Sequence, residues 1–250
     1  MDKGAILVLT FIGLFVSFVV WLIVSRLRAW KTRKQKLAEW ARRNGMQFTD
    51  GPAGATSFAP LPTLQVKGDV KSCEARHIAR GTRAELPVVV FDLLRGVTHQ
   101  YRHGAKSETK YGTFALFERR DRPLPYFDLS VLSAVSASSF QGKALGFVTN
   151  LAISLGADRG GGGVVTLEGR PGFLLRAHDE AAVRAVFTPS LLELLDQHPG
   201  FTVEAEGSHI LVGLQPRLSS GWTTPQIEEL LAYQDFDKFL PLAAAIAQRL

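Results

Sequence analysis

The stretch GAILVLTFIGLFVSFVVWLIV, residues 4–24, contains no charged residue and is followed at once by a basic stretch. At about 1.5 Å of rise per residue, a helix of these 21 residues matches the roughly 30 Å hydrocarbon layer of a bilayer. The run is longer than the apolar core of a secretory signal, and no small-residue cleavage motif follows it. The sequence therefore predicts an N-terminal transmembrane helix, retained as an anchor over residues 1–25.

The basic residues after this run predict an orientation. Six Lys and Arg follow it within twelve residues, whereas one Lys precedes it. Because basic flanks stay on the cytoplasmic side, we expect the N-terminus outside and the C-terminal domain in the cytoplasm, at the inner cell membrane. The alternative is that the basic residues set topology without binding particular lipids. The residues expected to contact anionic headgroups are Arg26, Arg28, Lys31, Arg33, Lys34 and Lys36.

The charge distribution argues against a nucleic-acid partner. The chain of 250 residues has a formal net charge of +6, but its first 43 residues hold nine of the 29 Lys and Arg and only two acids. The rest of the chain therefore carries 20 basic and 21 acidic residues. A nucleic-acid-binding domain concentrates positive charge on its folded surface. We expect membrane lipid and a protein as partners, and no nucleic acid.

A basic juxtamembrane helix is expected over residues 26–45, since residues 29–44 lack Pro and Gly and are rich in helix formers. Gly45 is the expected stop. Leu37, Trp40 and Ala41 share one face, which predicts that this part docks on the domain while residues up to about Lys36 stay among headgroups and water. Residues 46–63, rich in Pro and Gly, predict a linker or a covering loop.

The remaining residues, 64–250, show strand and helix patterns without a βαβ rhythm. The pattern predicts an α+β domain of mixed antiparallel sheet and helices, with a boundary between two subdomains at residues 133–142. The polar residues 96–109 are longer than most hairpin connections and are expected to form a loop. The expected strands are 72–80, 86–94, 110–118, 126–132, 164–168, 173–177, 201–206 and 210–214. The expected helices are 142–156, 179–187, one capped by Thr188-Pro189, and one capped by Thr224-Pro225 that Pro241 kinks or splits.

Catalytic and cofactor signatures are not found in the sequence. The Gly-rich residues 160–163 lack the Lys-Ser/Thr of a phosphate loop, so a flexible turn is favoured. His99 and His103 have the spacing of a zinc pair but no Glu between them. Cys73 is the single cysteine, which excludes an internal disulfide, and a buried thiol is the favoured interpretation. We expect no cofactor and no metal.

The chain resembles bacterial single-pass, membrane-anchored proteins of unknown function. The resemblance rests on Trp40-Ala41 with Gly45 and Phe48, and on the Val-Phe-Asp strand at Val90 to Asp92. Further pieces are Leu124 to Phe127, Phe173 to Leu175, Phe187 to Pro189, and Leu191-Leu192. The stretch Leu93 to Arg95 departs from the family, which carries more aromatic residues there. The resemblance implies one membrane span and a mixed domain, and it implies no activity.

Two functional hypotheses follow. The first is a non-enzymatic module at the membrane, whose cytoplasmic domain binds a protein or lipid partner. The alternative is an enzyme of unfamiliar type with a site near residues 96–109, where His99, Tyr101, Arg102 and His103 gather. No feature of the sequence supports a homo-oligomer, because small-residue pairs such as Gly13 and Ser17 are common by chance.

Overall fold

The computed structural model describes residues 3–101, 104–131, 163–165, 167, 170, 173–198, 201–214 and 236–250. In these residues ten strands form one sheet, in the order β1-β3-β4-β5-β10-β9-β6-β8-β7 with β2 beside β3, and every pairing is antiparallel. The strands are β1 (Gln47–Thr49), β2 (Ala53–Gly54), β3 (Val70–Arg83), β4 (Leu86–Tyr101), β5 (Gly104–Glu118), β6 (Leu124–Val131), β7 (Gly163–Val165), β8 (Phe173–Ala177), β9 (Phe201–Gly207) and β10 (His209–Leu214). The helices are α1 (Lys3–Arg43), α3 (Glu180–Val186), α4 (Pro189–Gln197) and α6 (Phe236–Arg249), with short 3-10 turns η1 (Ala55–Ser57) and η2 (Pro62–Leu64).

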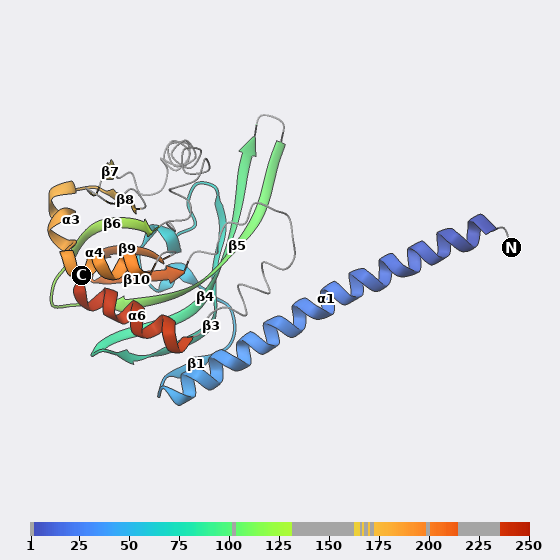
Figure 1. Ribbon diagram of the computed structural model, residues 1–250, viewed down its shortest axis with the longest axis horizontal. Helices are drawn as coiled ribbons and strands as arrows, with labels where there is room; N and C mark the ends of the chain where they lie inside the picture. Colours follow the sequence, from blue (N-terminus) through green and yellow to red (C-terminus); the bar gives the residue numbers. More distant parts are fainter. Residues whose placement is uncertain are drawn as a thin grey trace.

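The sheet is covered differently on its two faces. Helices α3, α4 and α6 and the C-terminal part of α1 pack on one face, which we call the helix face (Figure 1). Their apolar residues join those of β4, β5, β6, β9 and β10 in the larger core. Residues 53–65 pack on the opposite face, which we call the loop face, and form a second core with β3, β4, β5 and β10. The predicted α+β class is confirmed. Of the residues 46–63 predicted as a linker or covering loop, 47–49 form β1 of the sheet, whereas those from 53 onward belong to the segment 53–65 on the loop face, which we call the covering segment.

Strands from both sides of the expected subdomain boundary belong to the same sheet. Residues 133–142 lie outside the described residues, but β10 pairs with β5 and β9 pairs with β6. The larger core likewise joins Phe117 of β5 to Leu191 of α4. The described parts on either side of residues 133–142 therefore share one sheet and one core.

Helix α1 ends where the sequence predicts. Gly45 has a φ of +66°, the Met46 amide donates to the Ala41 carbonyl at 2.8 Å, and the Gly45 amide donates to the Arg42 carbonyl at 3.2 Å. This pair of bonds is the Schellman motif, in which a residue with positive φ turns the chain and satisfies the last carbonyls. The turn directs the chain from α1 into β1.

The predicted cap of α4 at Thr188 is confirmed, and α3 begins with a cap at Asp179, where the sequence predicted the first turn of the helix. Asp179 accepts a hydrogen bond from the Ala182 amide at 3.0 Å, and Thr188 accepts one from the Leu191 amide at 3.3 Å with Pro189 at the start of α4. Each cap satisfies a helix amide that has no partner within the helix. Pro241 lies inside α6, which is continuous over Phe236–Arg249, so the predicted split at this residue was wrong.

The predicted transmembrane helix is corrected by the structure. Among the described residues, no helix combines the length and the apolar character that crossing a bilayer requires. Residues 4–24 belong to one helix of 41 residues, Lys3–Arg43, which continues through the basic residues to the part that packs on the domain.

The loop predicted at residues 96–109 was also wrong. Strands β4 and β5 pair without interruption from Val88↔Phe117 to Tyr101↔Gly104, while β3 pairs with β4 only as far as Val97. The end of this hairpin therefore extends beyond the sheet as a two-stranded ribbon (Figure 1). Such a ribbon needs no apolar alternation, because both of its faces can be solvated. The helices expected at residues 142–156 and from Thr224 lie outside the described residues, apart from the part that forms α6.

Replacing Gly213 by Ala tests the packing of the loop face. A Cβ at Gly213 would overlap the ring of Phe114, its neighbour on β5, and would lie 2.9 Å from Thr202 Oγ1. Overpacking of this kind lowers the free energy of unfolding by about 1–3 kcal/mol. We expect urea unfolding of Gly213→Ala to show such a loss. Gly163→Ala is the matched control, because its Cβ meets nothing within 4 Å; equal effects of both substitutions would contradict the account.

Candidate functional site

Arg33 enters the centre of the domain from α1, where its exposed fraction is 2%. Its Nη2 donates to Asp92 Oδ1 at 2.9 Å and its Nε donates to Oδ2 at 3.2 Å. This two-pronged geometry is the strong form of an Arg–carboxylate pair. The same Nη2 donates to Thr113 Oγ1 at 2.6 Å. A single side chain of α1 is thus bonded to two neighbouring central strands, β4 and β5.

Asp92 has two further partners. The hydroxyl of Thr113 donates to Oδ1 at 2.6 Å, and Nδ1 of His77 lies 3.0 Å from Oδ2. We call Arg33, His77, Asp92 and Thr113 the buried polar cluster; its four members are at most 6% exposed and come from α1, β3, β4 and β5. Buried polar groups are stable only when they are hydrogen-bonded in this way.

The strands place these side chains by register and by a bulge. Asp92 lies directly opposite Thr113, on the face of β4 that also carries Val88 and Val90. In β3 the register shifts between Arg76 and Ala79, and within this bulge His77 has a φ of +50°. Positive φ in a residue other than Gly costs of order 1–3 kcal/mol and persists only where the surroundings enforce it. Here the bulge brings the imidazole of His77 to the carboxylate of Asp92.

Apolar residues of α1 and α6 close over the cluster. The guanidinium carbon of Arg33 lies 4.4 Å from the ring centroid of Phe236, and the rings of Trp40 and Phe236 are 5.4 Å apart. Leu37 and Ala41, on the same face of α1, are fully buried. The docking of residues 37–41 on the domain, predicted from the sequence, is confirmed. The stacked aromatic ring favours the charged guanidinium and keeps water from it.

The cluster holds Asp92 in its ionised form. Burial by itself raises the pKa of Asp92, but the hydrogen bond from His77 and the charge of Arg33 outweigh it and, with Thr113, lower the pKa to about 2. Asp92 is therefore a carboxylate at every physiological pH. The charge of Arg33 balances it inside the domain.

The hydrogen bonds of Asp92 tie α1 to the sheet and differ from those of a nucleophilic triad. A carboxylate that orients a histidine occurs in nucleophilic catalysis, where the imidazole in turn contacts a hydroxyl or thiol. Here the hydroxyl of Thr113 donates to Asp92 instead, and both oxygens of Asp92 are occupied by Arg33, His77 and Thr113. The arrangement fixes the angle at which α1 leaves the sheet.

The six basic residues predicted at the membrane surface have different surroundings. Arg28, Lys31 and Lys36 are exposed, and Lys34 forms an ion pair with Asp50, whose pKa that hydrogen bond lowers. For Arg33 the expectation was wrong, because its side chain lies inside the domain. The side chain of Arg26 lies outside the described residues. For the residues other than Arg33, contact with headgroups stays a prediction.

The other candidates from the sequence lie apart from the cluster. His99 and Tyr101 belong to β4, while Arg102 and His103 lie outside the described residues. Cys73 is buried in β3 on the loop face, where burial raises the pKa of its thiol, so the interpretation as a buried thiol is confirmed. In the part of the chain that the structure describes, His, Cys, Asp and Glu form no group of three or more suited to a metal ion.

The sequence contained a signal for the cluster that was misread. Arg33 stands four residues before Leu37 and seven before Trp40, so it occupies the apolar stripe of α1. Asp92 likewise follows the apolar residues 88–91, and the strand period of two places it on the same face as Val88 and Val90. A charge inside each of two apolar patterns is the mark of a buried ion pair. The pairing itself, 59 residues apart along the chain, has no local signature.

Comparisons with models of known protein families, with curated proteins and with solved structures found no match to this chain.

Removing the acid of the buried ion pair is expected to be costly. In Asp92→Ala, Arg33 loses the carboxylate that accepts two of its hydrogen bonds, and breaking a buried ion pair in this way destabilises a protein by about 3–5 kcal/mol. Equilibrium urea unfolding of the full chain measures this loss. The matched control is Asp50→Ala, which breaks the exposed pair with Lys34 and should cost no more than about 1 kcal/mol. If the two variants are equally stable, the cluster does not dock α1.

Acid should weaken the same cluster in a defined range of pH. The folded pKa of Asp92, about 2, lies below its ordinary 3.8. Its contribution, roughly 2.5 kcal/mol by linkage, is present above pH 3.8 and is lost as the pH falls toward 2. Urea unfolding between pH 2 and 5 should show this loss in the native chain and a smaller one in Asp92→Asn. An identical loss of stability in both chains as the pH falls would contradict the assignment of this loss to Asp92.

Proposed function

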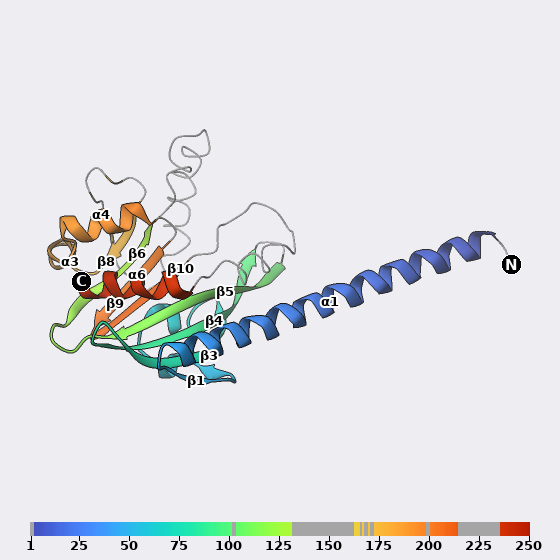
Figure 2. The ribbon, with the colours of Figure 1, turned by 60° about the horizontal axis from the view of Figure 1, so that its bottom comes forward.

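We propose that this chain is a membrane-associated binding protein, in which α1 holds the folded domain at an anionic lipid surface so that the domain binds a protein or lipid partner there. One observation carries the proposal. Helix α1 is fixed to the domain at its C-terminal end by the buried polar cluster, whereas its N-terminal part projects away from every other described element (Figures 1 and 2).

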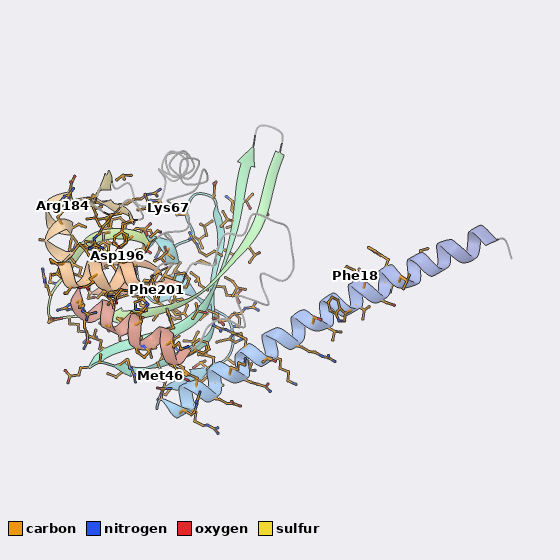
Figure 3. The ribbon with its side chains drawn as sticks, viewed as in Figure 1. Phe18, Met46, Lys67, Arg184, Asp196 and Phe201 are labelled. Atoms are coloured by element: carbon orange, nitrogen blue, oxygen red, sulfur yellow. The ribbon has the colours of Figure 1, made fainter. Side chains whose placement is uncertain are left out.

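The projecting part of α1 presents large apolar side chains to its surroundings. Phe18 lies far from the domain along the helix (Figure 3), and its ring stacks on that of Trp21 at 6.1 Å. The apolar side chains there that are 37% to 66% exposed are Ile12, Leu14, Phe15, Val16, Phe18, Val20, Trp21 and Val24. Exposed apolar side chains of this kind mark a surface that contacts a membrane or another protein. Contact with the lipid boundary lowers the free energy by about 1.5–3 kcal/mol for each side chain that it fully buries.

Basic residues follow the apolar part on the side nearer the domain. Arg28, Lys31 and Lys36 are exposed there. Each Lys or Arg near an anionic leaflet contributes about 1 kcal/mol of attraction. This order, apolar and then basic and then domain, supports a place for the domain at the cytoplasmic leaflet, where anionic lipids are concentrated.

The domain itself supports binding rather than nucleic-acid or enzyme function. Beyond residue 43 the numbers of basic and acidic residues are nearly equal, at 20 and 21. The enzyme hypothesis relied on a loop at residues 96–109, and these residues instead form the outer ribbon of β4 and β5. No other observation among the described residues favours it.

Vesicle flotation of the full chain tests the proposal. We expect the native chain to float with vesicles, and a variant with Leu14, Phe15, Phe18 and Trp21 all changed to Ser to stay at the bottom of the gradient. Val66→Ser with Val164→Ser is the matched control, since these two apolar residues are 52% and 45% exposed on the domain and should not affect flotation. Equal flotation of native chain and quadruple variant would overturn the role of α1.

The same assay tests the basic residues. Replacing Arg28, Lys31 and Lys36 together by Gln removes about 3 kcal/mol of attraction, so preference for vesicles with anionic lipid over neutral vesicles should fall by about two orders of magnitude. An unchanged preference would show that these residues do not contact headgroups. Capture of a partner by vesicle-bound protein, compared with the quadruple variant, then tests the binding role of the domain.

A further inference from the structure

A row of polar residues crosses the loop face of the sheet at some distance from the buried polar cluster. In β9, Glu204 is opposite Leu211 of β10 on one side and opposite Asp128 of β6 on the other. Asp128 is in turn opposite Arg176 of β8. Directly opposed residues on one face have Cβ atoms about 4.5–5.5 Å apart. The two carboxyl groups are therefore neighbours, and Glu204 is only 4% exposed.

The covering segment reaches Glu204 through its backbone. The Thr63 amide donates to both carboxyl oxygens of Glu204, at 3.3 and 3.2 Å, and the Thr63 carbonyl lies 3.6 Å from Cys73 Sγ as its acceptor. On either side of Thr63, Leu61 and Leu64 are fully buried in the second core. Thr63 is thus the point at which the covering segment is tied to two strands, β9 and β3.

We propose that Glu204 is a pH-dependent latch for the covering segment, residues 53–65: with its proton bound, the segment is held closed on the loop face, and loss of the proton loosens it. The proposal is independent of membrane association. It rests on a covered carboxyl group that faces a second carboxyl group and accepts the Thr63 amide, which ties the covering segment to β9.

The charges around Glu204 explain why it keeps a proton. Burial and then the charge of Asp128 raise the pKa of Glu204 to about 7, although the bonds from Thr63 and the charge of Arg95 act in the opposite direction. Among the described residues, further ionisable groups near Glu204 are Tyr126 of β6, Arg176 of β8 and Glu206 of β9. Residues 53–65 themselves contain no ionisable side chain, so the segment cannot titrate on its own.

The direction of the pH effect follows from linkage. When the segment lifts, Glu204 gains water and its pKa returns toward the ordinary 4.5. The closed form therefore binds the proton more tightly, and its advantage is complete below pH 4.5 and is lost as the pH rises to about 7. Because one proton is involved, opening becomes easier by about tenfold per pH unit between these limits and levels off above them.

Hydrogen exchange of the full chain, corrected for the intrinsic pH dependence of exchange, tests the latch. Protection of amides in residues 53–65 should fall by about two orders of magnitude from pH 5 to pH 7.5. Amides of β4 around Val90, which lie in the centre of the sheet, are the internal control and should not change. Flat protection in the segment, or a parallel loss in β4, would overturn the proposal.

Two variants distinguish the latch from a general effect of pH. Glu204→Gln keeps the shape and the acceptor for Thr63 but cannot ionise, so its protection should be independent of pH and should match that of the native chain at low pH. Asp128→Asn removes the facing charge, so the change should move to lower pH. If Glu204→Gln keeps the native pH dependence, or if Asp128→Asn leaves the midpoint in place, Glu204 is not the latch.

Discussion

The ion pair between Arg33 and Asp92 is the interaction on which the arrangement of this protein depends. It joins a helix of 41 residues to the middle of a ten-stranded sheet, through a carboxylate that also holds Thr113 and His77. Inside a protein such a pair contributes more to the orientation of the elements it joins than to net stability, because the cost of removing two charges from water offsets much of their attraction. Its geometry requires one orientation of α1, which purely apolar packing of Leu37 and Trp40 would leave less defined.

Each face of the sheet holds a buried carboxyl group, and the pKa values of the two groups are shifted in opposite directions. Asp92 lies next to a guanidinium and an imidazole and keeps its charge, with a pKa of about 2. Glu204 faces a second carboxyl group and keeps its proton to a pH of about 7. The difference comes from the groups that face each carboxyl group, which are Arg33 of α1 and His77 of β3 at Asp92 and Asp128 of β6 at Glu204. Asp92 holds α1 on the sheet. Glu204 makes the attachment of the covering segment depend on pH.

Local patterns in the sequence predicted the local structure well. The cap at Thr188, the stop at Gly45 and the docking of Leu37 to Ala41 each depend on a few neighbouring residues, and the structure confirms them. The sequence failed where burial depends on distant segments. Glu204 alternates with apolar residues like a solvent-facing position, yet it is buried and accepts a hydrogen bond from the covering segment. Residues 96–109 were polar enough for a loop, yet strand pairing alone sustains them.

The rigid attachment of α1 can be measured directly. Spin labels at Lys31→Cys on α1 and Glu193→Cys on α4, in a chain with Cys73→Ala, report the distance between helix and domain by pulsed electron resonance. The account predicts one narrow distance distribution, the same in detergent and in vesicles, and a broad one once Asp92→Ala is added. A broad distribution in the chain with Asp92 intact would contradict the claim that the buried ion pair fixes α1 to the sheet.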